Sequence, residues 1–175
     1  HPAHVTQANH TRNVIRTPAN NKLRMEDKRG EEHVKLSTDY GGKTQLNLGH
    51  NVDAQRALRG EGAELRTDDW VAVRGGKGVL ITAEMQAEAV DRMLEMECVI
   101  RQLEQALSLA RNLQRSAETA KATAGDTASQ ETLNDALEEL AQPGLILHAP
   151  AGVGMMSAKA VRVSSGTDSV GIMSG

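Results

Sequence analysis

The last part of the chain reads GLILHAPA (144–151), GVGMMSAK (152–159), AVRVSSGT (160–167) and DSVGIMSG (168–175). Aligned in this way, two apolar positions recur every eight residues, and the Gly, Pro and Ser residues between them favour turns. The fourth block is displaced by one residue. Such an octad is typical of one rung of a β-solenoid or β-prism, in which a single chain buries too little of each rung by itself. Stacking of rungs or intertwining of chains would complete the core, and three strands around one axis would supply it.

The apolar positions of these blocks are predicted to form the core of the trimer. They are Leu145, Leu147, Val153, Met155, Val161, Val163, Val170 and Ile172. The composition also favours a shared core, because the 175 residues include 17 Leu, 5 Ile and 13 Val but one Trp, one Tyr and no Phe. Large aromatic rings dominate most globular cores, so a compact monomer would be difficult to stabilise and we expect an oligomer.

Short alternating apolar segments lie upstream of this repeat. The pattern over 22–83 predicts six antiparallel strands, each apolar on one face and separated from the next by turn-forming residues. Their apolar residues are Leu23 and Met25, Val34 and Leu36, Leu46 and Leu48, Leu65, Val71 and Val73, and Val79 and Ile81. Residues 1–21 are polar, contain two prolines and lack periodicity, so they are predicted to be an arm or linker.

Residues 84–142 have a helical period instead. Apolar residues at a spacing of three or four predict a long amphipathic helix that begins near Glu84 and carries a coiled-coil seam from Met93 to Ala110. A second helix is predicted over 130–141, with Thr127 and Gln130 as a capping box. The residues predicted to pack the helices are Met93, Met96, Ile100, Leu103, Leu107, Leu133, Leu137 and Leu140.

The two predicted helices differ in length. At 1.5 Å per residue, the first would span about 57 Å and the second about 18 Å. Either the first helix breaks near its alanine-rich end, or the strands that flank the helical segment are well separated.

These patterns predict a mainly β fold with an α-helical insertion. The expected architecture is an intertwined trimeric β-prism or triple-stranded β-helix with a long-helix coiled coil or helical hairpin. Four parts are expected: an arm (1–21), a β-strand needle segment (22–83), the helical insertion (84–142) and the C-terminal β-prism repeats (143–175). Because the chain begins at His1 rather than Met, we expect it to be a piece of a longer protein.

The charge distribution excludes several classes of function. The formal net charge is −3, which is too small for a basic nucleic-acid binder or an acidic tail. The average conceals a split, because 84–142 contains twelve acids and five bases while 1–83 contains ten acids and thirteen bases. No apolar run is long enough to cross a bilayer, so stable membrane insertion is not expected. The single Cys98 excludes an internal disulfide and is expected to be exposed and unreactive.

Motifs that could indicate chemistry are better explained as turns or surface groups. Gly75-Gly-Lys-Gly78 lacks the Ser or Thr of a phosphate loop and leads into a strand rather than a helix. Adjacent Asp68 and Asp69 point to opposite faces of a strand, so they are poorly placed for paired acid–base catalysis. The six histidines are scattered, and the one metal site worth testing would gather one histidine from each chain on a threefold axis. We therefore predict no catalytic, cofactor-binding or metal-binding residues.

Five motifs resemble one known family. They are NKLRMEDKRGEEHVKL (21–36), TQLNLGH (44–50), RGEGAELRTDDW (59–70), VRGGKGVLI (73–81) and APAGV (149–153). Together they are similar to the C-terminal half of type VI secretion spike proteins, the VgrG (valine–glycine repeat) family, and the similarity extends from about Thr11 to Gly175. In that family the full chain forms a trimer whose base and neck precede a β-prism needle, and this sequence resembles the needle.

The resemblance implies a non-enzymatic spike that punctures target cells and carries effectors and a tip protein. The implied partners are two further copies of the chain, a secreted effector or its chaperone, a PAAR-type tip protein, and the tube protein through an N-terminal base outside this sequence. The implied location is the bacterial cytoplasm before firing and the target cell afterwards. One alternative is a dedicated effector- or chaperone-binding module that acts through the helical insertion. An enzyme, as in spikes with a fused toxin domain, is the third hypothesis.

Overall fold

A computed structural model describes residues 5–123, 125–166 and 170–172. The chain divides into two compact units, His1–Val73 and Arg74–Gly175, each of which is described by itself. Part of the predicted arm and much of the fourth octad lie outside the described residues.

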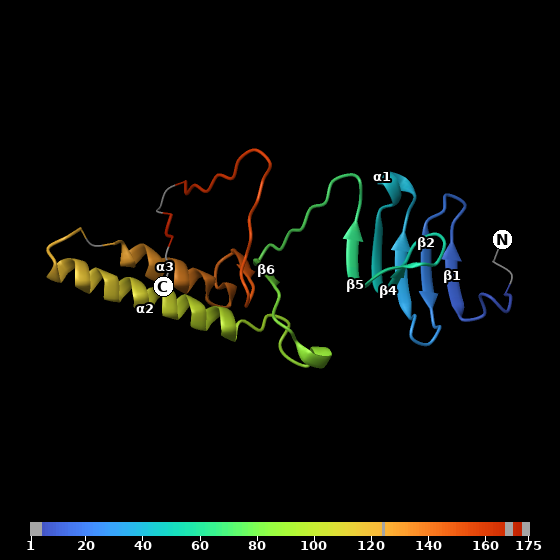
Figure 1. The fold of residues 1–175 in the computed structure, drawn as a ribbon, viewed down its shortest axis with the longest axis horizontal. Helices are drawn as coiled ribbons and strands as arrows, with labels where there is room; N and C mark the ends of the chain where they lie inside the picture. The colour runs from blue at the N-terminus through green and yellow to red at the C-terminus, as the bar shows by residue number, and fades with distance from the viewer. Residues whose placement is uncertain (1–4, 124, 167–169, 173–175) are drawn as a thin grey trace. The chain divides into compact units, whose positions relative to one another are not determined.

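The first unit is a five-stranded antiparallel sheet in which every strand pairs with its neighbours in sequence (Figure 1). Its strands are β1 (Arg12–Arg16), β2 (Lys22–Glu26), β3 (His33–Ser37), β4 (Gln45–Val52) and β5 (Leu58–Arg66). The apolar alternation had predicted β2 to β5, and these strands are confirmed. The sequence order of the strands follows from short turns, which join antiparallel neighbours directly.

Two expectations for this unit are wrong. Arg12–Arg16 belongs to β1 rather than to an arm, because it pairs along its length with β2 and its Arg12 guanidinium contacts Glu26. No strand contains Val71 or Val73, and this segment lies where the two units meet in the sequence. The strand was not predicted because most of its residues are polar, and an ion pair between Arg12 and Glu26 helps to hold it on β2.

Glycines make the turn between β3 and β4 possible. The short helix α1 (Tyr40–Lys43) contains Gly41 and Gly42, both with φ of 62°, in the left-handed region that other residues rarely adopt. The amide of Asp68 donates to the carbonyl oxygen of Gly41 at 3.0 Å. This hydrogen bond ties the turn to the segment that follows β5.

The second unit contains a two-stranded parallel sheet of β6 (Val79–Thr82) and β7 (Leu145–His148). The sequence predicts β6 as the last of six antiparallel strands and β7 as part of the first β-prism repeat, so their parallel pairing differs from the expectation for β6. They are parallel because the helical segment returns the chain to the end at which β6 began, as a crossover connection must. The strands that flank the insertion are therefore adjacent, and the alternative in which they are well separated is wrong.

The helical segment consists of α2 (Glu97–Thr119) and α3 (Thr127–Leu137), with 3₁₀ turns at Ala87–Ala89 (η1) and Glu138–Leu140 (η2). The prediction that the first helix begins near Glu84 is wrong. Residues 84–96 form no α-helix, and Glu88 and Ala89 within this segment have positive φ values of 53° and 52°. Side chains accept backbone N–H groups at both ends of the segment. The Thr82 hydroxyl accepts the N–H of Glu84, and the Glu95 carboxylate accepts the N–H of Glu97, each at 3.0 Å.

The second helix is capped differently from the prediction. The Asp126 carboxylate accepts the amide N–H of Ser129 at 3.0 Å, so Asp126 rather than Thr127 is the N-cap. The Thr127 hydroxyl instead donates to Gln114 on α2 at 2.6 Å, joining the two helices. Within the described ranges, no helix is both long and apolar enough to span a bilayer.

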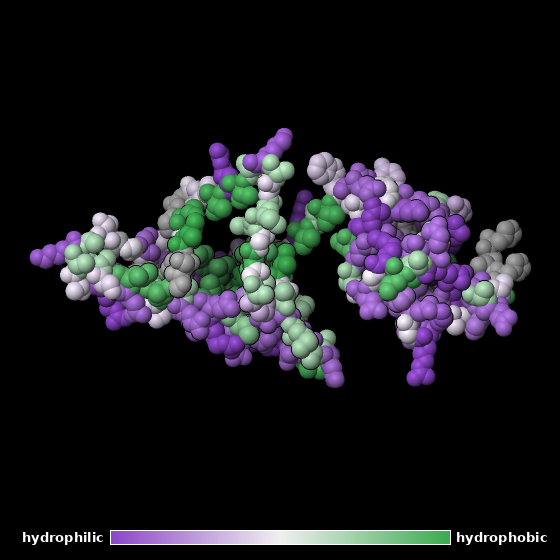
Figure 2. Space-filling model, viewed as in Figure 1, coloured by the Kyte–Doolittle hydropathy of each residue, from purple (hydrophilic) through white to green (hydrophobic). Residues whose placement is uncertain are grey.

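The buried core of the second unit is small. Met96, Val99 and Ile146 are its buried apolar residues, and partly buried side chains of the helices and β6 surround them. Figure 2 shows hydrophobic residues over the trailing segment of this unit, whereas the visible face of the first unit is mostly hydrophilic. Residues 149–166 and 170–172 form no strand, so among the described octad residues only the first block contains one.

Candidate functional site

Two rows of apolar side chains cross one face of the first unit's sheet. Directly paired residues of adjacent antiparallel strands share a face. By this register, one row contains Ile15, Leu23, Leu36, Leu46 and Leu65, and the other contains Met25, Val34, Leu48 and Ala63. The alternation had identified the strands as apolar on one face, but it did not reveal how their side chains align.

These rows lack a cover within the described unit. Leu36 is 56% exposed and Leu65 is 61% exposed. Scattered exposed leucines need no explanation, but contiguous apolar rows across five strands are typical of an interaction surface. The apolar face is therefore the main candidate assembly interface of this unit.

The opposite face of the sheet holds a buried ion pair. Glu26 is 5% exposed, and its carboxylate accepts hydrogen bonds from Arg12 Nε at 2.7 Å and from the Thr11 hydroxyl. Burial alone would raise the pKa of Glu26, but the hydrogen bonds from Thr11 and Arg12 outweigh burial and hold the pKa below its ordinary value. The ionised carboxylate therefore stabilises β1 on β2.

His33 lies beside this pair and is also buried. Its Nδ1 is 3.0 Å from the carbonyl oxygen of Glu31, whereas its Nε2 is buried without a hydrogen-bond partner in the described structure. Burial lowers the pKa of His33, and the Glu31 hydrogen bond only partly opposes that effect. The imidazole is therefore stabilised in its neutral form.

In the second unit, β7 alternates between two environments. Ile146 and His148 are buried toward the helices, whereas Leu145 and Leu147 are 60% and 48% exposed. The exposed fractions of all eight predicted trimer-core residues lie between 47% and 89%. Their burial by other copies of the chain stays a prediction.

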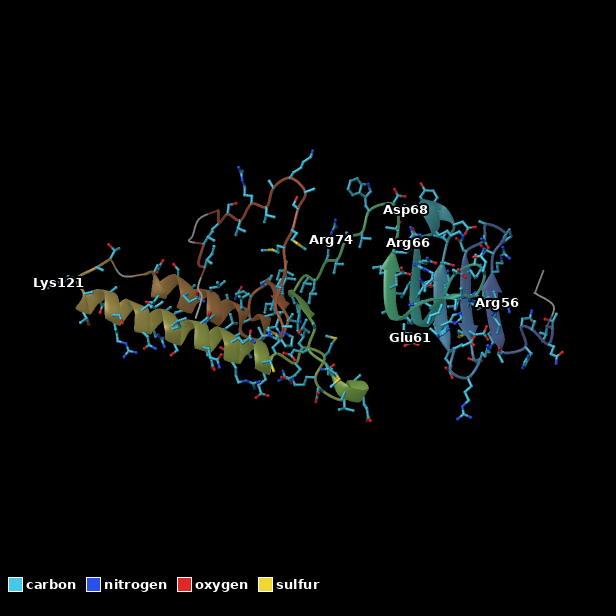
Figure 3. All side chains as sticks on the ribbon, in the orientation of Figure 1. Arg56, Glu61, Arg66, Asp68, Arg74 and Lys121 are labelled. Atoms are coloured by element: carbon cyan, nitrogen blue, oxygen red, sulfur yellow. The ribbon has the colours of Figure 1, made fainter. Side chains whose placement is uncertain are left out.

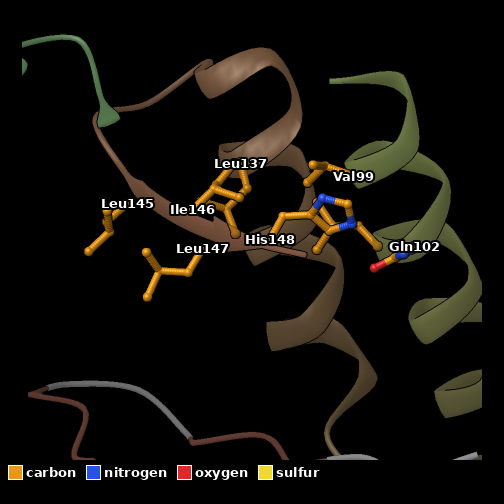
Figure 4. A pocket seen from close by; sticks show the side chains of 8 residues that line it. Val99, Gln102, Leu137, Leu145, Ile146, Leu147 and His148 are labelled. Carbon is orange, nitrogen blue, oxygen red and sulfur yellow. The ribbon is translucent and has the colours of Figure 1, made fainter. Parts of the chain in front are cut away.

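A pocket of about 370 Å³ lies between β7 and the helices. Figure 4 shows Val99, Leu137 and Ile146 around it, with the His148 imidazole near Gln102. His148 Nδ1 is 3.4 Å from the Thr82 hydroxyl and 3.7 Å from Glu84, but Nε2 is buried without a partner in the described structure. The wall is thus mostly apolar, with one polar end.

The structure distributes the predicted helical packing residues unevenly. Met96, Ile100, Leu103, Leu137 and Leu140 contribute to the core of the second unit, and Leu107 is half-buried. Met93 precedes α2 and is 88% exposed, because the helix begins later than predicted, while Leu133 is 50% exposed. Neither residue packs in the core of this unit, so any packing by them would require another chain.

The residues that could carry out chemistry are not gathered into one site within the described part of the chain. Among the described residues, no group of three His, Cys, Asp or Glu side chains is arranged to hold a metal ion. Gly75 and Gly78 form a turn, with a 3.0 Å hydrogen bond from the Gly78 amide to the Gly75 carbonyl oxygen, immediately before β6. Cys98 is half-buried, and Arg101 Nη2 donates to its sulfur at 3.0 Å.

Comparison with known proteins identifies relatives along most of the chain. The family model described as type VI secretion system Rhs element Vgr matches residues 12–117. The type VI secretion system spike proteins VgrG2a and VgrG2b of Pseudomonas aeruginosa are each 35% identical to this chain in alignments 149 residues long, and these alignments cover 76% of this chain. The chain spans 18% and 14% of the lengths of these two curated relatives.

Two solved structures have the same fold. One is titled "Structure of the Tle1 effector bound to the VgrG spike from the Type 6 secretion system", and the other is titled "The VgrG spike from the Type 6 secretion system". Each matches 94% of this chain with 69% sequence identity and a TM-score of 0.92. This chain covers 51% and 62% of those two chains, respectively.

Proposed function

Since this chain belongs to the VgrG family of type VI secretion system spike proteins, we propose that it forms the needle part of a homotrimeric spike. The observation that carries this proposal is the pair of uncovered apolar rows across β1 to β5. Two further copies of the chain would bury these rows against their own. Each buried leucine contributes about 1.5–3 kcal/mol, so rows of this length would provide a substantial interface.

The proposed trimer also includes the trailing repeat. Val153, Val161 and Val163 are 54–62% exposed in one chain and lie in a segment without strand partners. Pairing with other copies as a β-prism would satisfy their backbone groups and bury the side chains. Closure around an axis would also leave no strand edge open. Such a needle suits mechanical penetration of a target cell, and its action would require rigidity rather than catalysis.

We propose that the β-strand segment, the helical insertion and the C-terminal repeats have distinct places in this spike. The strands and the repeats would follow the needle axis, while the helical insertion would add its packing residues beside the axis, with or without a coiled-coil seam. The needle tip would bind a PAAR-type protein, and a base outside this sequence would bind the tube. The spike would assemble in the bacterial cytoplasm and leave it on firing.

Analytical ultracentrifugation tests this proposal. The chain should sediment as a trimer over a wide range of protein concentration. A folded monomer at low concentration, identified by its β-sheet circular dichroism, would contradict the shared core.

A second candidate function is docking of an effector or its chaperone through the helical insertion. It is favoured by the acidic character of 84–142 and by the effector bound to the related spike. Deleting the insertion would be uninformative, because parallel β6 and β7 cannot be joined by a short turn. A better variant replaces the exposed acids Glu104, Glu118 and Asp135 with their amides.

Effector capture by this triple variant separates the two functions. If the helices dock cargo through charge, capture should decrease while sedimentation still reports a trimer. If the triple variant captures as much effector as the unmodified chain does, the helices do not dock cargo through these charges and have a structural role in the spike.

A further inference from the structure

Basic side chains accumulate on the polar face of the first unit's sheet. By strand register this face carries two acids, Glu26 and Glu64, against six bases, which are Arg12, Arg16, Lys22, Arg24, Lys35 and Arg66. The β4–β5 turn crosses the sheet and brings Arg56 toward β1 and β2 (Figure 3), where its charge acts on Arg24. The face is therefore strongly positive.

Some of these charges are neutralised within the unit. Arg12 binds Glu26, and Arg59 binds Glu64 through Nη2 at 2.8 Å. Arg66 contacts Asp68 and donates to the Gly42 carbonyl oxygen at 2.7 Å. Both acids of the face are therefore already paired, Glu26 with Arg12 and Glu64 with Arg59.

The centre of the face lacks such partners. Lys22, Arg24 and Lys35 form no salt bridge among the described residues. Arg24 on β2 lies directly opposite Lys35 on β3, and Lys22 lies directly opposite Arg16 on β1. Like charges directly opposite each other on adjacent strands destabilise a sheet. The sheet thus contains two repulsive cross-strand pairs.

Burial strengthens this repulsion. The three side chains are half-buried, and burial, followed by the neighbouring cations, lowers the pKa of Lys22, Arg24 and Lys35. Arg24 Nε is buried without an acceptor in the described structure, so no hydrogen bond offsets the cost of its burial. A ligand that brings several negative charges to the accessible ends of the three side chains would offset their repulsion.

The spacing of the cations favours an extended polypeptide as this ligand. Lys22 and Arg24 are two residues apart on one strand, which separates them by about 6.5–7 Å. Alternate side chains of an extended chain have the same separation, whereas a single phosphate is too compact to meet both cations. We propose that this face is the docking surface for an extended acidic segment of a partner protein.

The docking surface is defined by Lys22, Arg24 and Lys35. It rests on the proposed function in one respect, because burial of the apolar rows in a trimer would leave the polar face outward and accessible. Alternate carboxylates of the partner would contact the three cations. Binding would relieve the repulsion between Arg24 and Lys35, so the bound sheet should be more stable than the free one.

Binding of a short fluorescent peptide of alternating Glu and Ser to the full chain tests the proposal. Arg24→Gln and Lys35→Gln should each weaken binding about tenfold, since each removes one charge-assisted contact. Arg29→Gln is a matched control, because this exposed base lies in the turn between β2 and β3, and the variant should bind as the unmodified chain does. A peptide with Gln in place of Glu should not bind.

Two further measurements keep the test decisive. Binding of the unmodified chain should weaken steeply with added salt, which requires no variant to fold. Inorganic pyrophosphate and vesicles containing phosphatidylserine are alternative anions, and binding to either without binding to the peptide would overturn the proposal. Sedimentation of the same samples separates the hypotheses: a trimer that ignores the peptide overturns the docking surface alone, whereas a monomer that binds it overturns the trimer alone.

Discussion

The side-chain amide of Asn134 on α3 donates a 2.8 Å hydrogen bond to the backbone carbonyl oxygen of Leu103 on α2. Asn134 is 8% exposed, and its own oxygen accepts from Gln130 Nε2 at 2.8 Å. The Arg111 guanidinium adds a contact to Glu131 with Nη2 at 2.6 Å. Polar contacts therefore fix the two helices against each other where their apolar core is thin.

Replacing Asn134 with Ala should destabilise the helical part of the chain by about 1–3 kcal/mol, because a buried hydrogen bond is lost and Gln130 loses its acceptor. Urea unfolding followed by helical circular dichroism measures this change. Asn112→Ala is the control, since Asn112 accepts from Arg115 on the exposed side of α2. An equal loss in both variants would refute a special contribution of Asn134.

The buried position of Asn134 also shows what the sequence could not reveal. Hydropathy alone favours its neighbour Leu133 as the packing residue, yet Leu133 is half exposed. The choice depends on the exposed carbonyl groups of the partner helix, which a periodic pattern does not contain. The spacing of apolar residues predicted that the helix exists, but it did not predict that Asn134 would face α2.

The strands, too, could be predicted only in part from the sequence. Strands β2 and β3 alternate cleanly between apolar and polar residues, whereas β4 and β5 were predicted from Leu46, Leu48 and Leu65 at one end of each strand. β1 contains adjacent Val14 and Ile15 between polar residues, and its long-range pairing with Glu26 is invisible in a local window. The same limit applies to the basic docking surface, because the sequence alone does not show which cations of different strands lie side by side. That information requires the strand register.

Acid should destabilise the first unit in two steps. The pKa of His33 is lowered in the folded chain, so its stabilising effect is complete above the unfolded value of about 6.5 and is lost as pH falls through the folded value. Glu26 also has a lowered pKa, and its contribution is lost as pH falls below about 4.3 and through its folded value.

His33→Asn should remove the upper step of this acid sensitivity, because Asn can still donate to the Glu31 carbonyl oxygen but does not titrate. The thermal midpoint measured at intervals between neutral and acidic pH should then remain level until the Glu26 step. His10→Asn is a matched control, since His10 Nδ1 is 2.8 Å from the Gln7 carbonyl oxygen at an exposed site. If the His10 variant removed the upper step instead, His33 would not be its source.

Gly49 and Gly62 are directly paired on β4 and β5, and both have positive φ, 92° and 104° respectively. A Cβ atom at Gly49 would lie 2.5 Å from the backbone oxygen of Glu32, whereas a Cβ at Gly62 would meet nothing within 4 Å. Gly62→Ala should therefore cost only the strain of a left-handed alanine, about 1–2 kcal/mol.

Gly49→Ala should cost more than Gly62→Ala, because the Glu32 backbone must also move. Each additional kcal/mol lowers the midpoint of a unit of this size by about 4–8 °C. Differential scanning calorimetry of the two variants measures the difference. Equal midpoints would show that the hydrogen bond from His50 N–H to Glu32 O does not hold this backbone in place.

Leu46 provides the sharpest test of the apolar rows as an assembly interface. It lies between Leu36 on β3 and Leu65 on β5 by direct register, and it is 37% exposed. In a monomer, Leu46→Asp would place a carboxylate at a partly solvated position and cost little. In the proposed trimer it would bury a charge in each of three chains, and loss of the leucine alone removes about 1.5–3 kcal/mol per chain.

Sedimentation should therefore show dissociation of the Leu46→Asp variant at concentrations where the unmodified chain remains trimeric. Val5→Asp, at a position before β1 that is 79% exposed, is the control for an apolar residue replaced by an acid and should leave the trimer intact. A trimer that tolerates Leu46→Asp would place its interface elsewhere, whatever the apolar rows suggest.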